Sequence, residues 1–323
     1  MKAAGSRAIG KGAGVGRTDA STGRLRGRAR EAFRQCFSFR WVAAAVIVLV
    51  WFVYFPVVDN FIISTTRSDI YTGDVSYVGL GNYSRLLHDK VVWSALWNNC
   101  AYAVISVIFQ VFGAFILAGI IESLRSDFWR RFWRALYFVP SAISLTVTGL
   151  LFYFIYQPQI GILDAVMRAT GLGALIQPWL GSEHTAIYAI IAMSQWQGFG
   201  YSTLLFAVAI QKIPGEIFDA ARIDGIGPIR RIISITWPLT REMTGLMILV
   251  TITGAFQVFN EVMVMTGGGP NNASQVLGTW VYQQGFIQDD FGYGAAIASV
   301  VFVATMLTGA AHLWYTKRGR VSW

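Results

Sequence analysis

The sequence predicts an all-α, polytopic membrane protein with six transmembrane helices, and three observations support this fold class. The chain is 54% hydrophobic and only 13% charged, whereas soluble domains carry about 25% charged residues. It contains long apolar runs, each close to the ~20 residues that cross a ~30 Å hydrocarbon core as a helix. Its basic residues gather between alternate runs. We expect the six spans at about 41–63, 95–121, 135–156, 186–210, 243–265 and 294–315.

The composition of these runs fits helices that pack inside a bilayer. They are apolar on nearly every face, as lipid-exposed and bundle-core helices must be. Pro140 in the third span should kink that helix because proline removes a backbone hydrogen bond. Small residues let helix backbones approach closely, and they occur at Gly113, Ala114, Ala118, Gly119, Ser141, Ala142 and Ser144. Buried helices of a soluble protein are the disfavoured alternative, because such helices need no apolar runs of this length.

The distribution of Lys and Arg predicts the orientation. Residues 1–40 hold 10 of them, 122–134 hold 4, 211–242 hold 5 and 316–323 hold 3, which together make 22 of the 26. Six spans place both termini and the two basic loops on one side of the membrane. The positive-inside rule makes that side the cytoplasm. The net charge of +9 is therefore a topology signal, and we expect no nucleic-acid partner.

Domain organisation follows from this topology. Residues 1–40 form a cytoplasmic basic tail, 41–316 the transmembrane domain, and 317–323 a cytoplasmic C-terminal tail. Within the first tail, 25–37 carry apolar residues on one helical face and arginines largely elsewhere. This pattern predicts an amphipathic helix in contact with membrane lipid at the inner surface, with a solvated basic tail as the alternative.

The cytoplasmic loop at 211–242 has the signals of two short helices joined by a turn. Pro214 fits the first position of a helix, and Glu216 and Asp219 complement its dipole. Gly225 after Asp224 suits the left-handed conformation that ends a helix. A second helix should begin at Pro228 and stop before Pro238.

The side chains of this loop suggest a docking element. Ala220 and Ala221 are small enough to let a helix backbone enter the groove of a partner. Apolar anchors that a solvated loop would not need occur at Ile217, Phe218, Ile223 and Ile226. The alternative is a helix that packs only against its own bundle.

The spacing from Asp219 to Pro238 resembles the E-A-A-x3-G-x9-I-x-L-P motif of permease subunits of binding-protein-dependent ABC importers. The matching residues are Ala220, Ala221, Gly225, Ile235 and Pro238. Asp219 replaces the leading Glu and Trp237 the usual Leu. Further resemblance lies at 78–83, 137–140, 213–217, 259–262 and 266–270. Together these segments are similar to the sugar-importing branch, the maltose and glycerol-phosphate type.

The resemblance implies a machine of several subunits in the bacterial inner membrane. This chain would pair with a second, homologous permease, two ABC ATPase subunits and an extracytoplasmic solute-binding protein. Docking to the ATPase would involve Glu216, Asp219, Ala220, Ala221, Asp224, Gly225, Ile235 and Pro238. ATP and Mg would be bound by the ATPases, so we expect no cofactor, no metal and no catalytic residue here, and no enzyme activity of the chain itself.

Polar side chains in two spans are the candidate substrate pathway. Sugars bind through hydrogen bonds from planar polar groups and through stacking on aromatic faces. Polar groups within a membrane helix are costly and are usually functional. In the resembling maltose permease the equivalent two helices supply the substrate contacts. The candidates are Ser194, Trp196, Gln197, Gly198 and Tyr201 in the fourth span, facing Gln257 and Asn260 in the fifth. The alternative is that these groups hydrogen-bond neighbouring helices. Glu261 also lies near the outer end of the fifth span, and its alternative role is a structural pairing near the membrane interface.

Other functions have weaker support in the sequence. No Lys or Arg lies within an expected span, which slightly favours a neutral saccharide over an anionic solute such as glycerol phosphate. Polyamine or amino-acid import is disfavoured by the 266–270 segment. An ion-coupled secondary transporter would need buried ionisable residues, and Glu261 is the one candidate. A membrane enzyme would need clustered ligands, whereas His88, His184 and His312 are scattered.

Overall fold

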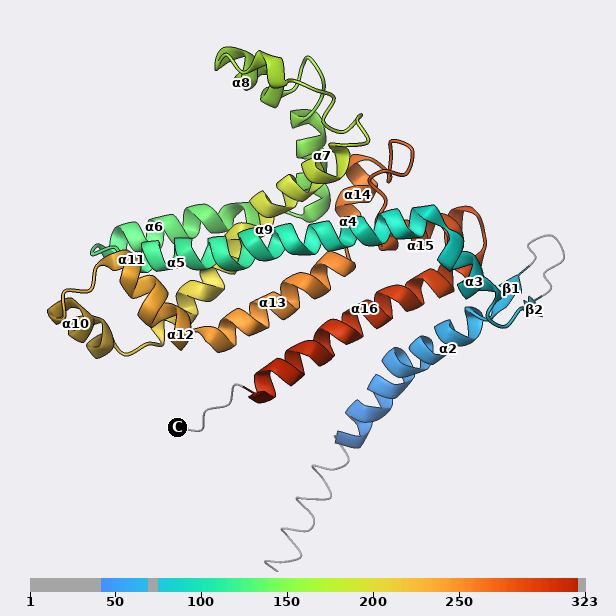
Figure 1. Cartoon of the computed structure of the whole chain (residues 1–323), viewed down its shortest axis with the longest axis horizontal. Coiled ribbons are helices and arrows are strands. Elements are labelled where there is room, and N and C mark those ends of the chain that lie inside the picture. Colours follow the sequence, from blue (N-terminus) through green and yellow to red (C-terminus); the bar gives the residue numbers. More distant parts are fainter. Residues whose placement is uncertain (1–41, 69–74, 319–323) are drawn as a thin grey trace, which may run out of the picture. The chain divides into compact units, whose positions relative to one another are not determined.

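The computed structural model describes residues 42–68 and 75–318 (Figure 1). The N-terminal tail, with its expected helix at 25–37, lies outside the described residues, as do 319–323. The chain divides into two compact units, Met1–Asp59 and Asn60–Trp323. All the packing described below lies within the second unit.

The described residues are mostly helical with little strand, which confirms the predicted fold class. The π-helices are η1, η2, η5 and η6, and the 3₁₀ helices are η3 and η4. The elements run in chain order as η1 (Val50–Tyr54), α2 (Phe55–Ile63), β1 (Thr66–Ser68), β2 (Val75–Tyr77), α3 (Gly81–His88), α4 (Lys90–Ser106), η2 (Val107–Gly113), α5 (Ala114–Glu122), α6 (Asp127–Phe138), η3 (Val139–Ala142), α7 (Leu145–Ile155), α8 (Ile162–Ala169), η4 (Gly173–Leu175), α9 (Ala186–Gln211), α10 (Gly215–Ile223), α11 (Pro228–Arg231), η5 (Ile232–Thr236), α12 (Trp237–Leu239), α13 (Arg241–Phe256), α14 (Asn260–Met265), α15 (Leu277–Tyr282), η6 (Gln283–Ile287) and α16 (Phe291–Arg318).

Helices cover all six expected runs, but not all of them are continuous. Within the described residues, three helices are long and apolar enough to cross a membrane: Val42–Ile63, Lys90–Glu122 and Phe291–Trp314. A pair bent by 90°, Asp127–Ala142 with Leu145–Ile155, passes the same test when taken together. Helix α9 covers the fourth expected run with 26 residues. The outer segment between the first two spans adds a feature the sequence did not predict, an antiparallel pair of the strands β1 and β2.

The third expected span is broken and not merely kinked. Helix α6 ends at Phe138, η3 contains Pro140, and α7 leaves at 90°. Hydrogen bonds in both directions join the break to α9. Gln197 Nε2 donates to the Ile143 carbonyl at 2.8 Å, and Ser141 Oγ donates to the Gln197 carbonyl at 2.6 Å. The sharp bend is therefore held by tertiary contacts and not by the proline alone.

The fifth expected span is also interrupted, between α13 and α14. Buried Asn99 of α4 ties the end of α13 to the start of α15, because its Nδ2 donates to the Ala255 carbonyl at 2.6 Å and its Oδ1 accepts from Leu277 N at 2.9 Å. Glu261 in the first turn of α14 is 5% exposed and accepts a 2.8 Å hydrogen bond from the Tyr102 hydroxyl. Glu261 therefore makes a buried contact between the second and fifth spans.

The second and sixth spans are joined at one end by Asp89. Its carboxylate caps α4 by accepting from Val91 N at 2.8 Å. The same carboxylate accepts from the Tyr293 hydroxyl at 2.6 Å and from Trp280 Nε1 at 3.2 Å. A helix cap thus also fixes the positions of α15 and α16.

Candidate functional site

The expected docking loop forms two helices at the end of the bundle where α5 ends and α6 begins (Figure 1). Helix α10 starts at Gly215, one residue after Pro214, which is its N-cap. Helix α11 begins at Pro228, as predicted. We call residues 214–239 the coupling segment.

The turn between the two helices has the predicted geometry. Gly225 has φ +70°, a conformation that L side chains rarely adopt. Its N–H donates to the Arg222 carbonyl at 3.1 Å, and Ile226 N donates to the Ala221 carbonyl at 2.9 Å. These two bonds form a Schellman motif, so Gly225 is needed for the fold of the segment itself.

The second helical stretch does not stop before Pro238, which corrects the sequence-based prediction. The chain continues from α11 through the π-helical turn η5 into α12, and Pro238 lies inside α12. The π-helical turn changes the hydrogen-bond register just before the proline, where a regular α-helix would need the N–H donor that proline lacks. Of the two motif residues here, Ile235 is half-buried and Pro238 is exposed.

The surface of the coupling segment is mixed in character. Its exposed docking candidates include Glu216, Asp219, Ala220 and Asp224. Beside them lie two unshielded apolar side chains, Ile223 at 87% and Ile229 at 74% exposure. Ala221, by contrast, is 3% exposed. Its small size is therefore explained by packing within the chain, whereas Ala220 is presented outward.

Part of the segment packs inward on other helices. Phe218 packs against the core cluster of α5, α9 and α13. Arg231 Nη2 donates to Ser123 Oγ at 3.0 Å. Arg134 Nε donates to Glu122 Oε1 at 2.7 Å. Because Arg231 and Ser123 belong to the basic loops 211–242 and 122–134, these two loops are in contact.

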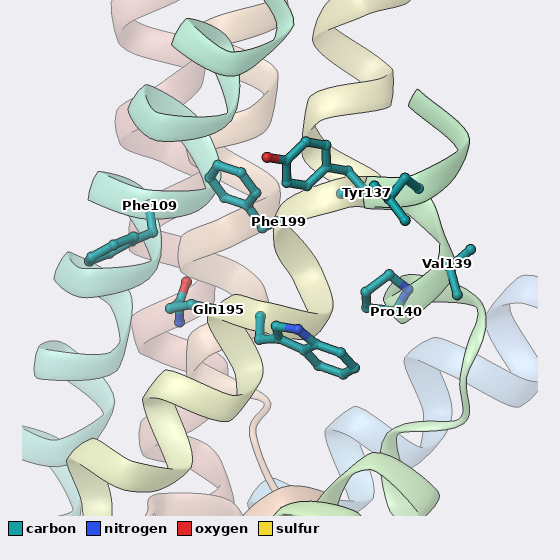
Figure 2. A pocket seen from close by; sticks show the side chains of 9 residues that line it. Phe109, Tyr137, Val139, Pro140, Gln195 and Phe199 are labelled. Atoms are coloured by element: carbon teal, nitrogen blue, oxygen red, sulfur yellow. The ribbon is translucent and has the colours of Figure 1, made fainter. Parts of the chain in front are cut away.

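A pocket of about 620 Å³ lies beside the broken third span. Figure 2 shows Phe109 and Gln195 on one side of it and Val139 and Pro140 on the other. The complete lining is Phe109, Leu136, Tyr137, Val139, Pro140, Gln195, Trp196, Phe199 and Gly200. We call it the aromatic pocket.

One predicted pathway residue, Trp196, lines this pocket. Its side chain is 45% exposed and its ring centroid lies 5.3 Å from that of Phe152. Sequence reasoning missed the neighbours Gln195 and Phe199, although they stand on the same helix one turn apart. The sequence signal that could have pointed to them is Pro140, because it marks the helix break that forms one side of the pocket.

The amide in the pocket lining is that of Gln195, and it is held by two neighbours in the second span. Gln110 Nε2 donates to Gln195 Oε1 at 3.0 Å, and Gln195 Nε2 donates to Ser106 Oγ at 3.0 Å. Gly198 makes room for this pair, since a Cβ there would lie 2.8 Å from Gln110 Nε2. Gly198 thus contributes space, and the Gln195 and Gln110 amides form a hydrogen-bonded pair between α9 and η2.

The remaining predicted pathway residues have other environments. The Gln197 amide bonds to the break of the third span. Tyr201 is exposed and Ser194 half-buried. Gln257 and Asn260 are exposed at the interruption between α13 and α14 and do not line the aromatic pocket. The fold therefore does not bring the seven candidates into one cavity.

The site's chemistry is that of binding by stacking and hydrogen bonding. Aromatic faces and the Gln195 amide line a cavity bounded by a helix break. Among the described residues, no group of three or more His, Cys, Asp or Glu side chains is placed to hold a metal ion.

Comparison with known proteins places the chain in a family. Residues 110–321 match the family described as "Binding-protein-dependent transport system inner membrane component". "Probable ABC transporter permease protein YurN" of Bacillus subtilis is 43% identical over 274 residues, covering 85% of this chain and 94% of the relative. "Arabinooligosaccharides transport system permease protein AraP" of the same organism is 30% identical, covering 82% of this chain and 83% of the relative.

A solved structure agrees with the fold. It is the "crystal structure of a bacterial ABC transporter involved in the import of the acidic polysaccharide alginate", with TM-score 0.74 and 17% identity, covering 88% of this chain and 97% of that chain. Because the identity is low, this likeness speaks for the fold alone. Sequence and fold together show that the chain belongs to the binding-protein-dependent transport system inner membrane component family and is an ABC transporter permease.

Proposed function

We propose that this chain is the membrane-spanning subunit through which an ATP-driven importer carries a saccharide into the cytoplasm. The observation that carries the proposal is the aromatic pocket, whose lining includes Trp196 and the amide of Gln195. Aromatic faces stack on the apolar faces of sugar rings, and amides supply both a donor and an acceptor to hydroxyl groups. Trp196 is the half-open ring best placed to stack on a sugar.

The names of relatives support the same substrate class. They include transport system permeases for arabinooligosaccharides, for sulfoquinovosyl glycerol and for trehalose/maltose. A second candidate substrate is glycerol phosphate, because the "sn-glycerol-3-phosphate transport system permease protein UgpA" of Agrobacterium fabrum is 28% identical over 86% of this chain. The pocket lining contains no Lys or Arg, which favours the neutral saccharide.

The assembly belongs to the proposal as well. The coupling segment docks an ABC ATPase in the cytoplasm through the exposed faces of α10 and α11. Glu216, Asp219, Ala220 and Asp224 supply its polar rim, and Ile223 and Ile229 its apolar contacts. A second permease, two ATPases that bind ATP and Mg, and an extracytoplasmic binding protein complete the importer. Both termini then face the cytoplasm, and the chain itself catalyses no reaction.

Uptake by intact cells tests the substrate class. Cells with the complete importer are compared with cells lacking this chain, using labelled neutral oligosaccharides and labelled glycerol phosphate. We expect ATP-dependent accumulation of a neutral oligosaccharide that requires this chain. Accumulation of glycerol phosphate alone would establish the second candidate. Uptake driven by an ion gradient without an ATPase would overturn the proposal.

A further inference from the structure

One face of the second span carries a row of residues that receive the coupling segment. The row consists of Phe112 in η2 and Phe115, Gly119 and Ser123 in and just after α5. These residues are spaced by three and four positions, so they share one helical face. We call this row the α5 seat.

The aromatic part of the seat holds Trp237. The Trp237 ring stacks on Phe112 with centroids 5.5 Å apart and an interplanar angle of 22°. It meets Phe115 edge to face at 4.8 Å. Both distances lie in the range where aromatic pairs attract beyond their buried area. The large residue that departs from the Leu of the motif is thus fitted between two rings of the second span.

The middle of the seat depends on the absence of a side chain. A Cβ placed on Gly119 would lie 3.0 Å from Ile232 Cγ1, 3.1 Å from Cδ1 and 3.2 Å from Cγ2. Ile232 is 7% exposed, so its side chain already fills the space above the glycine. Even an alanine at 119 would push on the coupling segment.

The polar end of the seat lies one helical turn further on. Ser123 Oγ accepts a 3.0 Å hydrogen bond from Arg231 Nη2, and the same hydroxyl donates to the Gly119 carbonyl at 2.6 Å. The Arg231 guanidinium also lies 5.6 Å from the centre of the Phe218 ring in α10. Arg231 therefore links α5 to both helices of the coupling segment.

The span that carries the seat also reaches the aromatic pocket. Going back along the same helical run, Gln110 of η2 bonds to Gln195, and Ser106 at the end of α4 bonds to the same amide. The helix Lys90–Glu122 is continuous. One helical rod therefore contacts the coupling segment at one end and the pocket at its middle.

We infer that the α5 seat is the contact through which movement of the coupling segment is passed to the second span and thereby to the pocket. The inference rests on the proposed function, since it assumes an ATPase that moves this segment. Gly119, Ser123 and Trp237 are then positioning residues, which set how strongly ATP turnover and transport are linked. The exposed faces of α10 and α11 remain the docking surface.

A paired substitution tests the seat. In the complete importer, purified and reconstituted into vesicles with the binding protein, Gly119→Ala should lower solute transported per ATP hydrolysed by about tenfold, a typical coupling factor. Ile232→Ala removes the three atoms that the new methyl group would meet. The double variant should therefore return to within about twofold of wild type. Gly254→Ala is the matched control, because no atom lies within 4 Å of a Cβ at that helical glycine.

The controls separate this inference from the proposed function and from simple damage. The ATPase should co-purify equally with wild type and all variants. Wild-type transport per ATP in Gly119→Ala, or a defect that Ile232→Ala leaves uncorrected, would overturn the inference. If Gly119→Ala fails to assemble, Ser123→Ala removes the hydrogen bond without adding bulk, and unchanged transport per ATP in that variant would overturn it as well. Failure of the wild-type chain to retain any ATPase would instead contradict the proposed function.

Discussion

Gln197 Nε2 donates a 2.8 Å hydrogen bond to the carbonyl of Ile143, a residue in the break of the third span. The two residues belong to different spans, and the bond satisfies an acceptor that the interrupted helix would leave open. Trp196, the preceding residue, instead lines the aromatic pocket with its half-exposed side chain. Of these adjacent residues of α9, Gln197 therefore holds the helix break, whereas Trp196 faces the pocket.

This difference predicts opposite outcomes for two neighbouring substitutions. Gln197→Ala should lower the free energy of unfolding by about 1 kcal/mol, since a partly buried carbonyl loses its donor. Trp196→Ala should leave thermal stability close to wild type and lower uptake. Thermal unfolding of the assembled importer, measured together with uptake, checks both.

Trp97→Ala is the matched control for Trp196→Ala, because Trp97 is a 71% exposed tryptophan of α4 that does not line the pocket. We expect Trp97→Ala to keep both wild-type stability and wild-type uptake. Wild-type uptake in Trp196→Ala at normal stability would exclude Trp196 from the pathway.

The docking face predicts a selective loss of ATPase association. Ile223→Glu places a charge on a side chain that is 87% exposed, so the bundle should fold normally. Truncating or replacing an apolar anchor at the centre of an interface commonly costs more than about 1 kcal/mol, so we expect roughly tenfold weaker retention of the ATPase. Co-purification at matched expression measures it.

Ile160→Glu is the control for this substitution. Ile160 is 84% exposed and lies in the loop before α8, away from the coupling segment. Loss of ATPase from both variants would point to general damage, and retention by both would contradict docking through α10.

The turn glycine gives a separate test of the coupling segment. Gly225→Trp should both block docking and strain the backbone, because Gly225 has φ +70°. Ala221→Arg should disturb the chain's own packing, because Ala221 is 3% exposed. We expect both variants to abolish uptake. In a thermal melt, Ala221→Arg should unfold at a lower temperature than Gly225→Trp. If both variants unfold at the wild-type temperature, position 221 accepts a large side chain.

The distribution of basic residues predicts that both termini lie in the cytoplasm. Single cysteines introduced at 1–20 should be protected from an impermeant thiol reagent added to intact cells, and cysteines at 266–293 should be labelled. The background is a chain in which Cys36 and Cys100 are replaced. Labelling of the first set would overturn the topology.

Buried Asn99 predicts a large stability effect. Asn99→Ala leaves the Ala255 carbonyl and Leu277 N–H without the partners they have at 2.6 and 2.9 Å. Each unsatisfied buried group costs about 1–3 kcal/mol, so thermal unfolding should occur at a clearly lower temperature. The control is Asn260→Ala, because Asn260 is an exposed asparagine at the interruption between α13 and α14. This variant should unfold at the wild-type temperature.

Features that depend on local chemistry were predictable from the sequence. The apolar runs specify membrane helices because a bilayer leaves no other partner for the backbone polar groups. Gly225 and Pro228 specify the turn and the start of the second helix because their backbone preferences act within a few residues. The motif from Asp219 to Pro238 was sufficient to identify the family.

Features that depend on distant residues were decided only by the tertiary structure. Pro140 signalled a kink, yet the structure has a 90° bend that is held from another span: Gln197 of α9 donates to the Ile143 carbonyl, and Ser141 donates to the α9 backbone. Likewise, the motif predicts Ala221 as a docking residue, whereas the structure shows that its side chain is buried within the chain. The aromatic pocket and the α5 seat bring together side chains that lie far apart along the chain, such as Ser123 and Arg231. No local sequence pattern encodes such contacts. Apolar helices of many different sequences can span a bilayer, and which of their faces meet is decided by packing and hydrogen bonds between helices.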